Sequence, residues 1–341
     1  MACFWKNERN AVEVCLREVG NYVYIGGVSP DYKLVEVARD LSGYVETDFS
    51  GPTYADHTLY SKRKRIYQLR YDATSTVWRD DGAGVFTEVA GALPGGWSVF
   101  AYNAYEVVYT AGKLRAVNWD GDSSVAFYES DDGEAWSLLP GSLAAIPYAT
   151  IGRPNHYTVV GGRILVNRVD VATSEPPFHY SDNGGATWTA STGADSTTNS
   201  GKNRFLHSGS NIIAIANSNV HVSSSSGASW TEYASLDVST GIGGGWPVMA
   251  ASGTGLVVSI VSSVGLAYSS DHGASWTTVA WVPAGIPDGE VYALYRDVAQ
   301  FVAFVRRSSG AYQIYTSPTG ASWAAGIVIP AIKLPPVQVI D

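Results

Sequence analysis

A short phrase that ends in an aromatic residue recurs along this chain and limits its architecture more than any other feature. The phrase reads YSDNGGATWT at residues 180–189 and YSSDHGASWT at 268–277. Weaker copies are YESDDGEAWS at 128–137, VSSSSGASWT at 222–231, YTSPTGASWA at 315–324 and WRDDGAGVFT at 78–87, the last with an extra residue and with Phe in place of Trp. An internal repeat of this kind predicts a fold built from equivalent units.

Each copy of the phrase predicts a β-hairpin. Aligned on the final aromatic, the pattern is Ser-x-Asp-x-Gly-x-Thr/Ser-Trp. Short Asp and Asn side chains accept hydrogen bonds from nearby backbone N–H groups, and Gly tolerates positive φ. The preceding residues are strand-like, as in Ala126–Tyr128 and Leu266–Tyr268. We therefore expect strand, ordered turn, Trp and strand in each copy.

The residues of the phrase are interpreted as a turn staple with a buried Trp, and a catalytic or Ca²⁺-binding role for its Asp residues is the alternative. Ser225 and Pro318 occupy the Asp position in two copies, where the side-chain-to-backbone bond is expected to be lost. The residues with this structural role are Asp80, Asp131, Trp136, Ser181, Asn183, Gly185, Trp188, Trp230, Ser269, Asp271, Gly273, Trp276 and Trp323.

The pattern resembles the Asp-box, or BNR, repeat of sialidase-like β-propellers. Five of the six copies end in Trp, and two match the pattern in full or with Asn for Asp. In that family the box joins the third and fourth strands of a blade and lies at the periphery, away from the central site. The resemblance implies an all-β fold, a β-propeller of four-stranded antiparallel blades.

The spacing of the anchor aromatics favours seven blades over six. Consecutive anchors from Phe86 to Trp323 lie 50, 52, 42, 46 and 47 residues apart, and Tyr44 lies 42 residues before Phe86. With six blades, residues 1–50 would be an appendage. We expect one domain over residues 1–341, with residues 330–341 as a closing strand or tail. Of the two strand-like segments 326–329 and 337–340, one is expected to finish the last blade and the other to pair with the open edge of the first blade. The blade anchors are Tyr44, Phe86, Trp136, Trp188, Trp230, Trp276 and Trp323.

Composition argues against two classes of partner. The formal net charge is −9, whereas a protein that binds a phosphate backbone usually carries the opposite sign. The one basic run, Lys62–Arg65, is interpreted as a solvated hairpin turn. No apolar run approaches the roughly 18 residues that span a membrane. The sequence therefore predicts neither nucleic-acid binding nor membrane insertion.

A ligand site is expected on the loops that enter the innermost strand of each blade, at the mouth of a central channel. Gly-Gly-Trp occurs there twice, at Gly95–Trp97 and Gly244–Trp246, and a flat indole face suits a sugar ring. The alternative is that both Trp residues pack between blades. The candidate ligand-binding residues are Trp97, Tyr148, Arg153, His156, Arg204, Trp246 and Trp281.

The sialidase-like resemblance raises the question of catalysis. Sialidase chemistry uses three arginines on the substrate carboxylate. Counted back from the anchors Trp230 and Trp323, Arg204 and Arg296 lie 26 and 27 residues away and are expected at equivalent blade positions, and with Arg153 they could in principle converge. The family's Phe/Tyr-Arg-Ile-Pro motif is absent, and Gly152-Arg153-Pro154 is the nearest match. The sequence gives no Tyr/Glu pair and no His/Cys cluster at zinc-ligand spacing. We therefore assign no catalytic residue, metal or cofactor, and favour a protein that is not an enzyme.

The favoured function is a non-enzymatic binding or structural propeller. The combination of this repeat type with a start that lacks a Sec-type signal favours a virion part, such as a phage tail or fibre protein. Such a protein would contact host surface glycan or a neighbouring virion protein, in several copies per assembly. A virion or extracellular-facing location is expected, with the cytoplasm as the alternative. The alternative functions are a sialidase-like glycoside hydrolase and an assembly-factor scaffold.

Overall fold

The computed structural model of the chain describes about three fifths of its residues. At several of them, chiefly before residue 124, only the backbone is described. The described residues are 15–17, 21–28, 31–38, 44–48, 57–62, 65–70, 76–80, 86–89, 108–110, 113–120, 124–132, 134–138, 146–147, 153–169, 176–194, 205–216, 219–233, 249–262, 265–279, 290–296, 299–307, 311–329 and 337–339.

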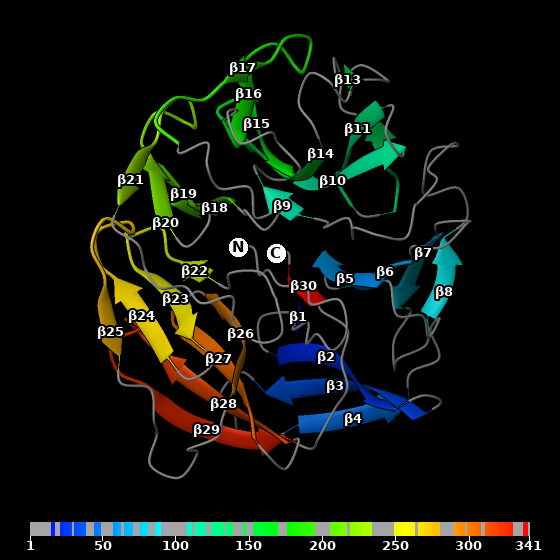
Figure 1. Cartoon of the computed structure of the whole chain (residues 1–341). Helices are drawn as coiled ribbons and strands as arrows, with labels where there is room; N and C mark the ends of the chain where they lie inside the picture. The colour runs from blue at the N-terminus through cyan, green and yellow to red at the C-terminus, as the bar shows by residue number, and fades with distance from the viewer. Residues whose placement is uncertain are drawn as a thin grey trace.

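Every secondary-structure element in this part of the chain is a β-strand. The strands form seven sheets, five of four strands and two of five. Within a sheet, strands that follow one another in sequence lie side by side and antiparallel, except that β13 pairs with β11 and not with β12. Figure 1 shows the sheets arranged around a common centre. The prediction of an all-β propeller with four-stranded antiparallel blades is confirmed.

The strands of the first three sheets precede residue 148. They are β1 (Cys15–Arg17), β2 (Asn21–Val28), β3 (Asp31–Ala38) and β4 (Tyr44–Asp48); β5 (His57–Lys62), β6 (Arg65–Arg70), β7 (Thr76–Asp80) and β8 (Phe86–Val89); and β9 (Val108–Thr110), β10 (Lys113–Asp120), β11 (Ser124–Ser130), β12 (Ser137–Leu138) and β13 (Ile146–Pro147).

The four remaining sheets follow, and a last strand joins the second sheet. They contain β14 (Arg153–Val160), β15 (Arg163–Val169), β16 (Phe178–Ser181) and β17 (Thr189–Ala190); β18 (Phe205–Ser208), β19 (Asn211–Ala216), β20 (Asn219–Ser223) and β21 (Thr231–Tyr233); β22 (Met249–Ala251), β23 (Val257–Ser262), β24 (Gly265–Ser269) and β25 (Thr277–Val279); and β26 (Glu290–Arg296), β27 (Phe301–Arg306), β28 (Tyr312–Ser317) and β29 (Ala324–Ile329). The last strand is β30 (Val337–Val339).

Tight hairpins hold neighbouring strands in register. Val160 pairs with Arg163 across two glycines at positive φ, Gly161 and Gly162, as two-residue hairpin turns prefer. The basic run of the sequence also turns between paired strands, because Lys62 of β5 pairs with Arg65 of β6. The hairpin interpretation of that run is therefore confirmed.

The anchor aromatics mark the same position in every sheet. Tyr44 and Phe86 are the first residues of β4 and β8, which are the outer strands of their sheets. Each of the five anchor tryptophans directly precedes an outer strand: β12, β17, β21, β25 or β29. The recurrence of the phrase every 42 to 52 residues thus reflects one outer strand per sheet.

The hydrophobic core lies between neighbouring sheets. One cluster joins Leu206 and Ile213 of β18–β21 to Met249 and Val257 of β22–β25, with Trp276 packed against it. Another cluster joins the sheets β14–β17 and β18–β21 through Leu165, Phe178, Phe205, Ile212, Ala214 and Trp230. A strand therefore buries apolar side chains on both of its faces, one face against each neighbouring sheet.

The anchor tryptophans pack on the sheet that precedes their own. The ring of Trp188 lies 5.8 Å from that of Phe127 on β11, and the ring of Trp230 lies 4.5 Å from that of Phe178 on β16. Trp136 and Trp230 are buried, while Trp188, Trp276 and Trp323 are partly buried. Each outer hairpin therefore closes the interface with the sheet before it.

Glycine permits the close approach at this interface. Gly227, in the turn before Trp230, has φ of 84°, and a Cβ there would lie 2.6 Å from Cδ1 of Leu165 on the preceding sheet. Such a contact is shorter than van der Waals packing allows. The Gly of the phrase is therefore required both by backbone conformation and by the neighbouring blade.

The C-terminal strand does not pair where the sequence analysis expected. β29 completes the last sheet as predicted, but β30 pairs parallel with β5 of the second sheet, Val337 opposite Leu59, and not with the first sheet. The inner strand β5 has six residues and β1 has three, so β5 offers the longer free edge. The expectation of pairing with the first blade is wrong in this respect.

Replacing Trp276 by Ala should lower the free energy of unfolding by about 3–5 kcal/mol, because it empties part of the interface between two sheets. Chemical denaturation measures the change. Thr278→Ala, an exposed position of the same hairpin, is the control and should cost little. A loss below about 1 kcal/mol for Trp276→Ala would contradict this packing.

Deleting residues 331–341 should lower the melting temperature by several degrees, because it removes β30 and exposes the inner edge of β5. Removal of residues 340 and 341 alone leaves β30 intact and is the control. An unchanged melting temperature for the longer deletion would show that β30 does not stabilise the ring.

Candidate functional site

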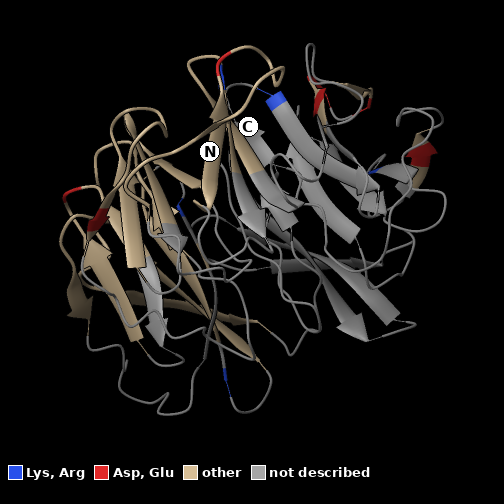
Figure 2. Ribbon diagram, turned by 45° about the horizontal axis from the view of Figure 1, so that its top comes forward, with Lys and Arg blue, Asp and Glu red and all other residues tan. Residues whose placement is uncertain are grey.

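The turns that carry the phrase gather at one end of the sheets. In the sheet β18–β21, Ile212 pairs both with His207, next to the hairpin that joins the first two strands, and with Ser223, at the start of the turn before Trp230. We call this end the turn face and define it by the repeat turns 130–136, 181–188, 223–230, 269–276 and 317–323. In Figure 2 the described charged residues lie mainly on turns and strand ends.

The turn at 181–188 is held by two side chains. Ser181 Oγ accepts hydrogen bonds from the backbone N–H of Asn183 and Gly185, at 3.4 and 2.8 Å, and donates to Asn183 Oδ1. Asn183 Oδ1 also accepts from the Thr187 N–H at 2.9 Å, and Asn183 Nδ2 donates to Thr187 Oγ1. The turn therefore satisfies backbone donors that would otherwise need water.

The turn at 269–276 has the same bonds with a carboxylate in the central position. Asp271 Oδ1 accepts from Ser269 Oγ at 2.7 Å and from the Ser275 N–H at 2.8 Å, and Oδ2 accepts from Ser275 Oγ. Burial by itself raises the pKa of Asp271, but the hydrogen bonds from Ser275 and Ser269 outweigh it, so the pKa lies below the usual value of 3.8.

The turn at 223–230 keeps a bond that the sequence analysis expected it to lose. Ser225 stands in the Asp position, and its Oγ accepts from the Ser229 N–H at 2.9 Å. Ser223 Oγ accepts from the Gly227 N–H at 2.8 Å. A hydroxyl can replace the carboxylate here because it also has lone pairs within reach of the same N–H group.

The turn at 130–136 uses a different carboxylate from the one predicted. Asp132, not Asp131, accepts from the backbone N–H groups of Glu134 and Ala135, at 2.9 and 3.1 Å. Ser130 Oγ accepts from the Asp132 N–H. The segment between Ser130 and the Trp is one residue shorter than in the full copies, so alignment on Trp136 shifted the assignment by one position.

The turn at 317–323 is short in the same way, so Thr319 and not Pro318 stands where Asp132 stands in the turn at 130–136. Ser317 Oγ accepts from the Gly320 N–H at 2.7 Å, while Pro318 has no polar side chain to offer. Thr319 Oγ1 accepts from the Ala321 N–H at 3.3 Å. Asp80, the candidate of the sixth copy, is the last residue of β7, and its side chain lies outside the described atoms.

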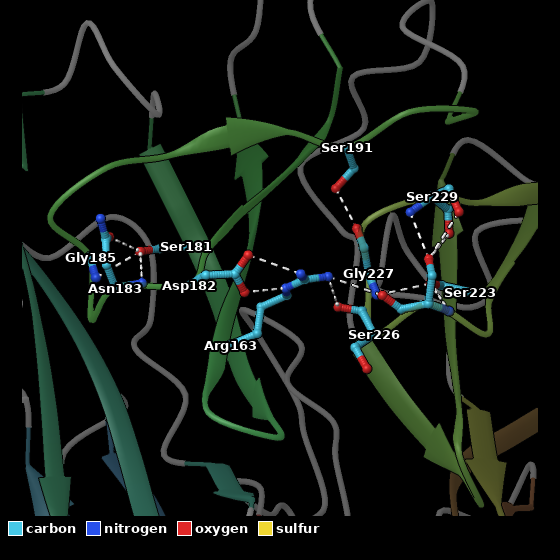
Figure 3. A network of polar contacts seen from close by, with 11 residues as sticks. Arg163, Ser181, Asp182, Asn183, Gly185, Ser191, Ser223, Ser226, Gly227 and Ser229 are labelled. Atoms are coloured by element: carbon cyan, nitrogen blue, oxygen red, sulfur yellow. Dashed lines mark hydrogen bonds and ion pairs between the residues drawn. The ribbon is translucent and has the colours of Figure 1, made fainter.

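Arg163 links two neighbouring turns, as Figure 3 shows. Its Nε and Nη2 donate to the two carboxylate oxygens of Asp182, at 2.7 and 2.9 Å, and its Nη1 donates to the carbonyl of Ser225 at 3.0 Å in the next sheet. The guanidinium also lies 4.2 Å from the centroid of the Tyr180 ring. The hydrogen bond from Arg163 lowers the pKa of Asp182.

A short strap also crosses from one sheet to the next at this point. Ser191 Oγ donates to the carbonyl of Gly227 at 2.6 Å. Thr192 forms a parallel bridge: its N–H donates to the Ala228 carbonyl and its carbonyl accepts from the Trp230 N–H at 2.8 Å. The residues after β17 therefore extend the contact between the two sheets by backbone pairing.

Other basic side chains on the turn face have similar partners. Lys113 Nζ lies 2.6 Å from Glu129 Oε1 and 3.7 Å from Asp131 Oδ2. Arg296 Nη1 donates to the carbonyl of Pro318 at 3.2 Å. These cations neutralise or cap the turns of their own sheets, as Arg163 does with Asp182.

A histidine forms a further link between sheets. His272 has φ of 60° in the turn before Trp276, and its Nδ1 lies 2.9 Å from Oγ of Ser208, the last residue of β18. Ser208 is buried and its hydroxyl donates to the carbonyl of Ser252 at 3.0 Å. A buried hydroxyl with this geometry holds two blades together and is not accessible to a substrate.

The predicted channel-mouth residues fall largely outside the described residues. Five of the seven lie outside the described part of the chain: Trp97, Tyr148, Arg204, Trp246 and Trp281. At the other two, Arg153 and His156 of β14, only the backbone is described. The assignment of a ligand to these seven residues therefore stays a prediction.

The arginines proposed for a substrate carboxylate do not share one end of the sheets. Arg296 ends β26, pairs with Phe301 and lies at the turn face, whereas Arg153 begins β14 at the opposite end. Phe301 pairs with Ser317 just as Ile212 pairs with Ser223, so Arg296 corresponds to His207 and not to Arg204. Counting back from the tryptophans failed because the strands and turns differ in length.

The chemistry of the described turn face is that of a hydrogen-bonded rim. Asp182 and Asp271 have lowered pKa values, which suits an ionised hydrogen-bond acceptor better than a general acid at neutral pH. Among the described residues there is no group of three His, Cys, Asp or Glu side chains that could hold a metal ion. In the same residues no helix is long and apolar enough to cross a membrane.

Sequence reasoning missed the contacts between turns. Arg163, Ser191 and His272 were not singled out, because each acts on a partner in another repeat unit. A comparison of the second strand of each sheet could have identified the basic residue that binds the turn. Lys113 and Arg163 are the first residues of the second strands β10 and β15, and each faces the Asp that directly follows the Ser of its turn. Nothing local in the sequence pairs Ser191 with Gly227.

Comparison with known proteins gives a likeness of shape. No protein-family model matches the chain, and no curated protein matches it. Among solved structures, YCF48 bound to D1 peptide is 14% identical, with a TM-score of 0.48 over 79% of this chain and 81% of that chain. YCF48 from Cyanidioschyzon merolae is also 14% identical, with a TM-score of 0.47 over 80% of this chain and 86% of that chain. At these TM-scores the likeness says nothing of function.

Replacing Asp271 by Asn should remove part of the chain's sensitivity to acid. Because the pKa of Asp271 is lowered on folding, its contribution to stability is present above the usual value of 3.8 and is lost as the pH falls through the folded value. Asn183 occupies the same position in the other full turn, so the amide should fit. Denaturation curves from pH 7 down to pH 3 measure the effect.

The reciprocal change, Asn183→Asp, is the matched control for this experiment. It should add a similar acid-dependent contribution in the turn at 181–188 while leaving the fold intact. Parallel pH profiles for the natural protein and Asp271→Asn would contradict a stabilising carboxylate at position 271.

Proposed function

We propose that this chain is a non-enzymatic binding propeller, a rigid ring that holds a protein partner in an assembly. The observation that carries the proposal is that the charged side chains of the turn face are engaged in hydrogen bonds within the fold. There Arg163, Asp182 and Asp271 bind turns and neighbouring sheets at 2.7–3.0 Å. Side chains committed to such contacts make a stable platform but have little freedom for chemistry.

The acid–base properties of Asp182 and Asp271 argue against either of them as the general acid of a hydrolase. A glycosidase of two carboxylates needs one whose pKa is raised so that it can protonate the leaving group. Asp182 and Asp271 are shifted the other way. The separation of Arg153 and Arg296 to opposite ends of their strands also removes the three-arginine arrangement considered for a sialidase-like enzyme.

A protein partner is preferred to a glycan because the rim of the propeller presents β-strand edges and hydrogen-bonded turns, which suit main-chain recognition. The virion interpretation, a phage tail or fibre propeller that contacts host glycan, rests on the resemblance to Asp-box repeats and on the Gly-Gly-Trp loops. It is the second candidate, and Trp97 and Trp246 are the residues that would carry it.

One experiment separates binding from catalysis. The purified protein is incubated with fluorogenic sialosides and with bacterial surface polysaccharide, and turnover and binding are measured on the same samples. We expect no turnover above the rate without protein. Arg204→Ala and Trp246→Ala are made in parallel, with Thr231→Ala, an exposed position on the outer strand β21, as the control.

The outcomes are distinct. Sustained turnover that is lost in Arg204→Ala would overturn the proposal in favour of a hydrolase. Polysaccharide binding without turnover that is lost in Trp246→Ala would favour the glycan-binding candidate over a protein partner. The absence of both, together with a partner that binds at the rim, is the result expected for the scaffold.

A further inference from the structure

The outer strand of each sheet has a free edge that could pair with another chain. Such an edge presents unpaired backbone N–H and C=O groups, and natural sheets protect it by shortness or by charge. Among the described outer strands, β12 and β17 have two residues, and β21 and β25 have three. The longer strands β4 and β8 carry carboxylates, Glu46, Asp48 and Glu88.

β29 has neither form of protection. It has six residues, Ala324 to Ile329, none of them charged, and it stands last in its sheet with β28 as its only partner among the described strands. Val328 is 45% exposed, and the one other exposed large hydrophobic residue of the described set is Leu138, at 37%. β29 is therefore the longest outer strand described and the least polar.

A bulge in β29 is stabilised from inside the sheet. Gln313 pairs with Val328 and Tyr315 with Ala325, so two residues of β29 lie opposite one of β28. Gln313 is buried, and its Nε2 donates to the carbonyl of Gly326 at 2.6 Å. The bulge thus has its own partner, and the ladder continues on both sides of it.

We propose that β29 is a docking edge for an extended, uncharged segment of a partner protein, which adds to the sheet β26–β29 as a further strand. The unpaired backbone groups call for a strand, because only a strand satisfies a row of them at once. The absence of charge in β29 favours a segment without charges of its own. The exposed side chain of Val328 offers an apolar contact to alternate residues of that segment.

A separate protein is a better occupant than a second copy of this chain. A six-residue strand is about 20 Å long, so two propellers that met there would share much less than the roughly 1,600 Å² of a stable interface. Each copy also carries a formal net charge of −9, which opposes self-association. The fold already extends two sheets in this manner, since β30 adds to β5 and β13 adds to β11.

The inference rests on the proposed function only in taking the partner to be a protein. Its test uses the full chain and an acetylated, amidated peptide of alternating Thr and Val. Backbone hydrogen exchange is followed with and without peptide, and the affinity is measured by titration. We expect slower exchange in β29 and unchanged exchange in β25. Val328→Lys should weaken binding by about tenfold or more, because it places a charge on the edge.

Two controls make the result specific. Leu138→Lys alters the other exposed hydrophobic residue and should leave the affinity unchanged. The same peptide with alternate N-methylated residues keeps its composition but cannot form the ladder, so it should not bind. Equal binding of the N-methylated peptide, or no slowing of exchange in β29 at millimolar peptide, would overturn the proposal.

Sedimentation velocity over a range of protein concentrations tests the other occupant. A dimer that Val328→Lys dissociates would show that a second copy, and not a partner protein, occupies β29. Turnover in the sialoside assay would contradict the proposed function and would leave the exchange result at β29 unaffected, so the two failures can be told apart.

Discussion

The ring depends on the contact that each outer hairpin makes with the sheet before it. Trp188 packs on Phe127, Trp230 on Phe178, and Trp276 on the cluster that contains Ile213. Because a single four-stranded sheet cannot bury both of its faces, each blade supplies the cover that its neighbour lacks. The Gly before the Trp makes this cover fit, as the contact between Gly227 and Leu165 shows.

Polar contacts add to this apolar packing without being its main source. A neutral hydrogen bond contributes about 1 kcal/mol net, and exposed ion pairs contribute less. These contacts instead select a single conformation for each turn. Any other conformation would leave buried hydroxyls, such as those of Ser181, Ser223 and Ser269, without hydrogen-bond partners, which costs free energy. Arg163 and the strap at Ser191 connect one turn to the next, so neighbouring turns are fixed in relation to each other.

The repeat made the architecture predictable, because spacing and turn chemistry are local properties. The outer-strand position of every anchor, from Tyr44 to Trp323, followed from the sequence pattern. Positions that depend on the exact length of a turn did not follow, as Asp132 and Arg296 show. Contacts between units were also out of reach, because nothing in the residues near Ser191 or Arg163 says which neighbour they meet. The candidate ligand residues were expected on loops, where the pattern gives no register, and two of them, Arg153 and His156, lie on β14 instead.

The pairing of β30 with β5 has a consequence for the order of folding. The paired residues Leu59 and Val337 lie 278 positions apart in the sequence, so the inner edge of β5 stays open until the last sheet has formed. Contacts of such long sequence separation are slow to form because the loop that they close costs entropy. During synthesis the early sheets would therefore stand with an exposed edge while the later ones are still being made. That interval is when chaperones, or premature partners, have access to the incomplete ring.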